Sequence, residues 1–197
     1  MRSLLVFIFL SLLSNYLAAD SCDIEDLMIQ NSKESSLFQF TQEKQIKFLS
    51  KPLISQGELL QTDTGELVWQ TQKPIKTTLV LTRERVKQFD SLDKSVDLPG
   101  ASIVKNLSNT FLSLLSGDFS RLKIDFHSTV SCKASKYSLE LIPKNSELKA
   151  LFSNIKVSGQ LSVETVVIEE ARGDLTTIHL TKFSSSTSSL LDRYLDN

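Results

Sequence analysis

The chain has 197 residues, 22 basic against 23 acidic side chains, and a formal net charge of −1, which excludes the basic footprint of a nucleic-acid-binding protein. With 41% hydrophobic and 23% charged residues it has the composition of a globular chain that can build a core. Only 6 glycines and 2 histidines are present, so we expect neither a phosphate-binding loop, a multi-histidine metal cluster, nor a cofactor.

The first segment, residues 1–19, has the pattern of a secretory signal peptide. Arg2 precedes an apolar run over residues 4–13, and the small pair Ala18 and Ala19 comes before the acidic Asp20. An uncleaved membrane anchor is the alternative, but the run has about half of the roughly 20 residues needed to span a bilayer. Cys22 also allows a lipoprotein, although the residues before it fit a lipidation box poorly. We expect cleavage after Ala19 and export.

Export bears on the only two cysteines, Cys22 and Cys132. An oxidising compartment permits a bridge between them, and a loop of that length is worth about 4 to 5 kcal/mol in the chain-entropy model. The alternative is one buried and one exposed thiol. His127 lies five residues before Cys132 on the same predicted strand, hence on the opposite face, which argues against a catalytic thiol and imidazole pair.

The first half of the exported chain predicts one short helix and then strands. Ile24, Leu27 and Met28 have helical spacing, so we expect an amphipathic helix over residues 23–32. From residue 37 the apolar period changes to two, which indicates strands with one buried face and one face in water. These strands are expected at residues 38–41, 45–48, 58–60, 67–70, 77–82 and 86–89, with a turn at 62–65.

A long helix then interrupts the strands. Residues 97–99 open it and residues 116–117 close it, and its apolar residues recur at intervals of four, four and three. Strands are expected again at residues 124–130, 137–143, 155–157, 161–168 and 175–183, with a helical turn near 146–151 and a hairpin turn at 172–174. The Ser-rich segment 184–189 predicts a linker to a short terminal helix or a loose tail, so the domain would span residues 20–183 and the tail 184–197.

About ten strands joined by short turns predict an α+β fold. We expect one antiparallel sheet that curls into an open or closed barrel with the long helix over its mouth. The inner face would be filled by that helix as a solid core, or would hold an apolar guest when the helix moves away. The predicted cavity residues are Phe38, Phe40, Phe48, Trp69, Leu79, Leu81, Phe126, Leu139 and Leu141, and the predicted lid residues are Ile103, Leu107, Phe111 and Leu114.

Six stretches follow one another along nearly all of the exported chain. They read FTQEK at 40–44, FLSKPLISQGEL at 48–59, LVW at 67–69 followed by Pro74, LELIPK at 139–144, IKVSG at 155–159 and EEARGDLT at 169–176. In order and spacing they resemble the LolA family, the periplasmic carriers of outer-membrane lipoproteins. The resemblance is strongest to a divergent branch encoded beside lipid or polyene export genes.

The resemblance implies an unclosed half-barrel with a helical lid over an apolar cavity. It further implies a monomeric periplasmic carrier of lipid or lipoprotein cargo, with an inner-membrane exporter, an outer-membrane acceptor and transient membrane contact. One stretch departs from the family. Members closest to the founding carrier have a basic residue and a proline before the tryptophan strand, and that arginine latches the lid, whereas residues 61–66 read QTDTGE. This departure favours a different lipid or an acylated metabolite as cargo.

Three other functions compete with a carrier. A hydrolase is disfavoured because His127 and His179 are isolated and no serine lies in an elbow motif, so we expect no catalytic residue and no enzyme. An outer-membrane barrel is disfavoured by the inserted helix and by the lack of a final aromatic residue. A structural or interaction module of the envelope stays as the alternative, and it predicts a filled core without bound lipid.

Overall fold

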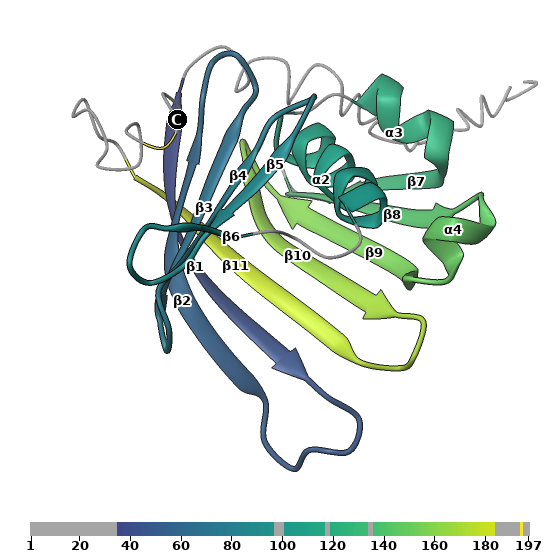
Figure 1. The fold of residues 1–197 in the computed structure, drawn as a ribbon. Coiled ribbons are helices and arrows are strands. Elements are labelled where there is room, and N and C mark those ends of the chain that lie inside the picture. Colours follow the sequence, from purple (N-terminus) through teal and green to yellow (C-terminus); the bar gives the residue numbers. More distant parts are fainter. Residues whose placement is uncertain (1–34, 97–100, 117–118, 134–135, 184–193, 195–197) are drawn as a thin grey trace, which may run out of the picture.

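The strands form a single curled antiparallel sheet. The computed structural model describes residues 35–96, 101–116, 119–133, 136–183 and 194. In this part of the chain eleven strands pair in the order β6-β5-β4-β3-β2-β1-β11-β10-β9-β8-β7, and the sheet curls around α2 without closing (Figure 1). The predicted α+β fold, an unclosed half-barrel with a helix over its concave face, is confirmed.

The N-terminal half of the sheet is a meander of hairpins. Its strands are β1 (Ser36–Gln45), β2 (Leu53–Gln61), β3 (Leu67–Lys73), β4 (Thr77–Leu81), β5 (Val86–Phe89) and β6 (Ser95–Val96). Successive strands pair antiparallel, as expected for short turns. We call the end of the sheet that carries the β1–β2, β3–β4 and β10–β11 turns the turn end.

The prediction of two separate strands at 38–41 and 45–48 is wrong. β1 runs without a break to Gln45, the chain turns over residues 46–52, and Lys44 pairs with Leu53 of the returning strand. The apolar alternation continues past the end of β1, but no neighbouring strand covers it there. Phe48 is therefore 85% exposed at the hairpin tip instead of lying in the core.

The inserted helix and the C-terminal half complete the fold. The predicted long helix is α2 (Ala101–Ser116), and the predicted helical turn is α4. The remaining elements are α3 (Phe119–Asp125), β7 (Phe126–Lys133), β8 (Lys136–Pro143), α4 (Ser146–Lys149), β9 (Phe152–Gly159), β10 (Val163–Glu170) and β11 (Leu175–Phe183).

Several strand starts differ from the predicted ones, among them those of β2 (53 against 58), β9 (152 against 155), β7 and β10. Ile124 belongs to α3 and is exposed, because the strand begins only at Phe126; Val130 on the edge strand β7 is exposed as well. β10 begins at Val163, and an irregularity in its pairing with β9 lies between Val163 and Thr165. This irregularity changes the phase, so Val163 and Val166 are both buried although an undistorted strand would place them on opposite faces.

The sheet is apolar on both faces over β2–β5, which the alternation did not predict. The large core lies on the concave side, and a second cluster on the convex side contains Leu60, Val68, Val80, Phe89 and Tyr194. Tyr194 comes from the predicted tail and is only 4% exposed. Its ring lies 5.3 Å from that of Phe89, so at this residue the chain packs on the domain and is not a loose tail.

Several predictions concern segments beyond the described residues. The signal segment 1–19, the helix at 23–32, Cys22 and the Ser-rich segment lie there. Cys132 on β7 is disulfide-bonded, and Cys22 is the only other cysteine of the chain. The pairing of Cys22 with Cys132 stays a prediction because Cys22 itself is not described.

Candidate functional site

A cavity of about 360 Å³ lies between the concave face of the sheet and α2. Strands β1, β3, β4, β10 and β11 form its wall, and Ser108 and Phe111 of α2 cover it. Its sheet lining consists of Gln42, Leu67, Trp69, Thr71, Thr77, Leu79, Leu81, Ile168, Thr176 and Ile178.

The lining changes from apolar to polar toward the turn end. Along β3 it runs from Leu67 through Trp69 to Thr71, and Thr77 pairs with Thr71 at the start of β4. Gln42 lies near the end of β1 that leads into the β1–β2 turn. The cavity therefore has an apolar interior and a row of hydrogen-bonding side chains at one end.

Three aromatic rings pack together beside the cavity, and two of them, Trp69 and Phe111, line it. The ring of Trp69 lies 4.5 Å from that of Phe40 and 6.1 Å from that of Phe111, the second contact being edge-to-face at 82°. Phe40 in turn lies over Gly57 of β2, where a Cβ atom would come within 2.9 Å of the ring and 1.9 Å of the Gln70 carbonyl oxygen. Gly57 thus lets β2, β3 and the Phe40 ring approach closely.

The structure separates the predicted cavity residues into three groups. Trp69, Leu79 and Leu81 line the cavity. Phe38, Phe40, Phe126, Leu139 and Leu141 are buried in the concave core without lining it. Phe48 is exposed at the β1–β2 tip, so its assignment to the cavity is wrong.

Phe126, Leu139 and Leu141 do not line the cavity because the C-terminal half of the concave side is filled. Phe126 stacks on Phe152 with ring centroids 6.0 Å apart, and Leu114, Leu122 and Leu148 of the three helices belong to the same core cluster. Sequence periodicity marks an inward residue, but it does not show which part of the concave face the helices cover.

The predicted lid residues lie on α2, which covers the concave face. Phe111 lines the cavity and touches Trp69, whereas Leu114 is fully buried in the core and anchors the helix. The side chains of Ile103 and Leu107 are outside the described part of α2. Ser108, which lines the cavity, and Thr110 on the same helix are buried as well.

The polar lining continues into an ion pair at the turn end. Thr176 lines the cavity and donates to Glu170 Oε1 at 3.1 Å, and the same oxygen accepts from Lys44 Nζ at 2.6 Å. Both charged side chains are partly exposed, so the pair contributes little to stability. Because Glu170 pairs with Lys44, the positive charge of Lys44 at the polar end of the cavity is compensated.

Residues 61–66, which lack the family arginine, form the β2–β3 turn. Gly65 N–H donates to the Thr62 carbonyl at 3.0 Å, and Thr62 N–H donates to the Glu66 carbonyl at 3.0 Å. Thr62 Oγ1 also accepts from the Glu66 amide at 2.9 Å. Polar groups of this turn thus satisfy one another.

No catalytic constellation is found among the described residues. His127 is exposed on edge strand β7, while His179 is exposed on β11 with its Nδ1 3.4 Å from Thr165 Oγ1. Across that part of the chain, no three His, Cys, Asp or Glu side chains gather as metal ligands. No helix there combines the length and apolar character needed to cross a membrane.

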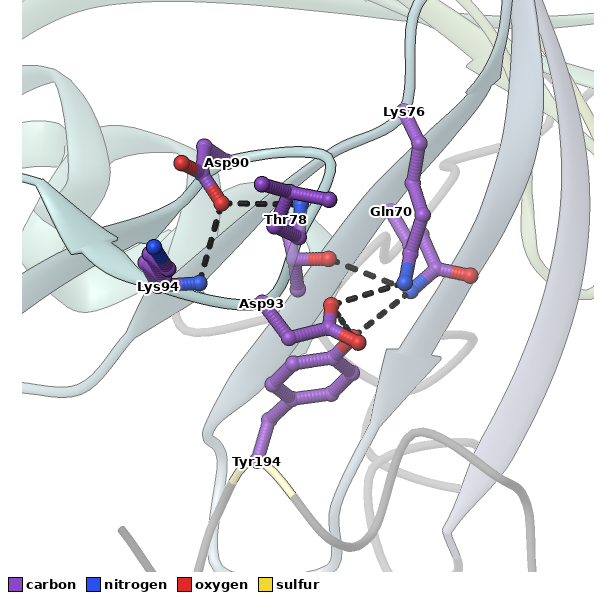
Figure 2. Close-up of polar contacts among 8 residues, drawn as sticks. Gln70, Lys76, Thr78, Asp90, Asp93, Lys94 and Tyr194 are labelled. Carbon is purple, nitrogen blue, oxygen red and sulfur yellow. Dashed lines mark hydrogen bonds and ion pairs between the residues drawn. The ribbon is translucent and has the colours of Figure 1, made fainter.

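A polar network on the convex side holds Tyr194 (Figure 2). Tyr194 Oη donates to Asp93 Oδ1 at 2.6 Å and accepts from Gln70 Nε2 at 3.3 Å. Lys76 Nζ pairs with the same Asp93 oxygen at 2.7 Å, and this hydrogen bond is the main cause that raises the pKa of Lys76. Asp90 holds the turn that presents Asp93, because its carboxylate accepts two backbone N–H bonds of that turn.

Comparisons with known proteins place the chain in a family. A search of curated proteins finds no match. Solved structures with similar folds include a LolA-superfamily protein from Nitrosomonas europaea (9% identity, TM-score 0.45, covering 84% of this chain and 93% of that one). They also include the MucA/MucB complex from Pseudomonas aeruginosa (10%, 0.47, 86% and 60%) and a DUF1329 family protein from Desulfovibrio piger (13%, 0.45, 84% and 93%). The model of the family described as outer membrane lipoprotein carrier protein LolA matches residues 31–190. The chain therefore belongs to the LolA family.

Proposed function

We propose that the protein is a periplasmic carrier that takes up an acyl chain of a lipid, lipoprotein or acylated product and carries it from the inner to the outer membrane. The observation that supports this most is the cavity of about 360 Å³ with a largely apolar interior. Its volume lies near the lower end of the usual range for ligand pockets, which suits one acyl chain rather than several.

The carrier step needs burial and no chemistry. Each buried CH₂ is worth about 0.8 kcal/mol against water, so a ten-carbon chain held in the cavity gains about 8 kcal/mol over the same chain in solution. A chain that moves from a bilayer into the cavity exchanges one apolar environment for another, so transfer is close to balance. An exporter in the inner membrane can therefore load the cavity, and an acceptor with a more apolar site can empty it.

The graded lining orients the cargo. The acyl chain would lie against Leu67, Trp69 and Leu79, and its ester or amide linkage would face Gln42 and the threonines at the turn end. Because Glu170 already pairs with Lys44, this end suits a neutral hydrogen-bonding linkage better than a free anionic group.

α2 is the lid in this proposal. Phe111 fills part of the cavity beside Trp69, so cargo entry would move this ring and the helix turn that carries it. Leu114 stays in the core as the pivot. Of the other predicted lid residues, Ile103 and Leu107 would move with Phe111.

Loading is tested with a fluorescent fatty acid and with protein isolated from its own periplasm. Native mass spectrometry of the isolated protein should show one bound acyl species. Leu79→Gln, which adds a polar amide to the cavity wall, should weaken fatty-acid binding about tenfold. The control Leu92→Gln makes the same change at an exposed site in the β5–β6 turn and should bind normally. Protein that is isolated without a bound acyl species and also fails to bind fatty acids would refute the carrier function and favour the structural module.

A further inference from the structure

The β1–β2 tip, residues 46–54, exposes more apolar surface than a soluble hairpin requires. Phe48 is 85% exposed, Leu53 and Ile54 are each 53% exposed, and Leu49 is exposed beside them. The tip projects beyond the neighbouring β10–β11 hairpin at the turn end (Figure 1). Several exposed apolar side chains at one projecting position are typical of a surface that contacts a protein or a membrane.

The tip is locally basic. It carries Lys47 and Lys51 and no acidic residue, although the whole chain has a net charge of −1. Lysines that flank a Phe/Leu surface form the pattern of interfacial membrane segments, in which the apolar groups enter the acyl boundary and the ammonium groups meet anionic head groups.

Several backbone N–H and C=O groups of the tip are hydrogen-bonded within the protein. Leu49 N–H donates to the Ile46 carbonyl at 2.9 Å, and the Gln45 side-chain amide donates to the carbonyls of Leu49 at 2.9 Å and Ile46 at 3.3 Å. Lys47 N–H donates to Asp174 Oδ1 at 3.0 Å. Each unsatisfied backbone group would cost free energy in lipid, so these bonds lower the cost of insertion.

We propose that the β1–β2 tip docks the protein on an anionic bilayer, with Phe48 inserted below the head groups and Lys47 and Lys51 at their level. This surface lies outside the cavity, so the proposal does not depend on the carrier function. The docking proposal has a consequence for the carrier function, because the polar end of the cavity lies at the same end of the sheet as the tip. A docked protein would present that end of the cavity to the membrane surface.

The test is vesicle flotation of the exported full-length chain. Binding to vesicles of phosphatidylcholine with phosphatidylglycerol should exceed binding to phosphatidylcholine alone and should fall with salt. Phe48→Ser should lower the partition coefficient about tenfold, and replacing both Lys47 and Lys51 by Gln should lower it about fivefold per lysine. The control Ile124→Ser, at a site 72% exposed on α3, should have no effect.

A second measurement reports insertion directly. Trp69 is the only tryptophan, so Phe48→Trp in a Trp69→Phe background places a single fluorophore at the tip. Its emission should shift to the blue on addition of phosphatidylglycerol vesicles and should be quenched by brominated acyl chains. No shift, or equal losses from Phe48→Ser and Ile124→Ser, would overturn the proposal.

The experiments test the docking surface and the carrier function separately. Leu79→Gln should bind vesicles as the unmodified protein does, and Phe48→Ser should still bind fatty acid in solution. Vesicle binding without fatty-acid binding would refute the carrier alone, and the reverse result would refute the docking surface alone. A dimer that Phe48→Ser converts to a monomer, with no binding to vesicles, would assign the tip to self-association and overturn the membrane proposal.

Discussion

Gly57→Ala offers a direct test of how the cavity wall is built. The new Cβ would lie 1.9 Å from the Gln70 carbonyl oxygen and 2.9 Å from the Phe40 ring. The first contact involves backbone, so it cannot be relieved by a rotamer change. β2 and β3 would have to separate locally by more than about 1 Å, which strains or breaks ladder hydrogen bonds worth about 1 kcal/mol each. With overpacking of about 1 to 3 kcal/mol, we expect a total loss of about 3 kcal/mol.

Gly65→Ala in the same hairpin is the matched control. Gly65 has a φ of +84°, and nothing lies within 4 Å of an added Cβ. Its cost is therefore conformational only and should be about 1 to 2 kcal/mol. Gly57 has no positive φ, so the two variants separate a steric cost from a backbone one.

Urea unfolding followed by tryptophan fluorescence measures both effects. The free energy of unfolding gives the loss of stability, and the emission of Trp69 reports the cavity wall because its ring contacts Phe40. Gly57→Ala should alter the native-state emission, and Gly65→Ala should not. Equal stability losses in the two variants, with unchanged emission in both, would refute the argument that β2 and β3 approach closely at Gly57.

Four further outcomes follow from single side chains. The Tyr137 hydroxyl is buried with no hydrogen-bond partner among the described residues, and burial raises its pKa, so Tyr137→Phe should leave the free energy of unfolding unchanged or raise it by about 1 kcal/mol in urea titrations. Tyr194→Phe removes the hydroxyl that donates to Asp93 and should lower it by about 1 to 2 kcal/mol in the same assay. Lys76 has a raised pKa in the folded state, so the stabilisation from its hydrogen bond with Asp93 is complete below its ordinary pKa of 10.5 and is lost as pH rises through the higher folded value. Lys76→Met should abolish that part of the loss of unfolding free energy at alkaline pH. Phe111→Ala enlarges the cavity and should increase the preference for long over short fatty acids in competition binding, whereas an unchanged preference would show that Phe111 does not limit cavity length.

The sequence predicts the inward face of the strands well and the location of the cavity poorly. Period-two alternation identified Trp69, Leu79 and Leu81 as inward, and each lines the cavity. The same alternation places Leu67 and Thr71, on either side of Trp69, on the same face, and both line the cavity as well. Polar lining residues such as Gln42 carry no local signal, because a polar residue on a strand is ordinarily taken to face water.

The errors have separate physical causes. Phe48 continues the alternation of β1 past its last strand partner, and pairing with a neighbouring strand cannot be read from one strand alone. The phase of β10 depends on a pairing irregularity that leaves no composition signal. The filled C-terminal half depends on where α2, α3 and α4 lie, which is tertiary information.

The convex cluster explains how a thin wall can border a cavity. β3 and β4 have no solid core behind them where the cavity lies, and β5 and β6 beyond them are short. A sheet packed on one face only would lose contacts there. Tyr194 packs on the opposite face beside Phe89 of β5, and Gln70 of β3 donates hydrogen bonds to the hydroxyls of Thr78 on β4 and of Tyr194. These strands are therefore apolar on both faces for two reasons. One face borders the cavity, and Tyr194 packs on the other. Stability lost on the convex side should reach the cavity through these two strands.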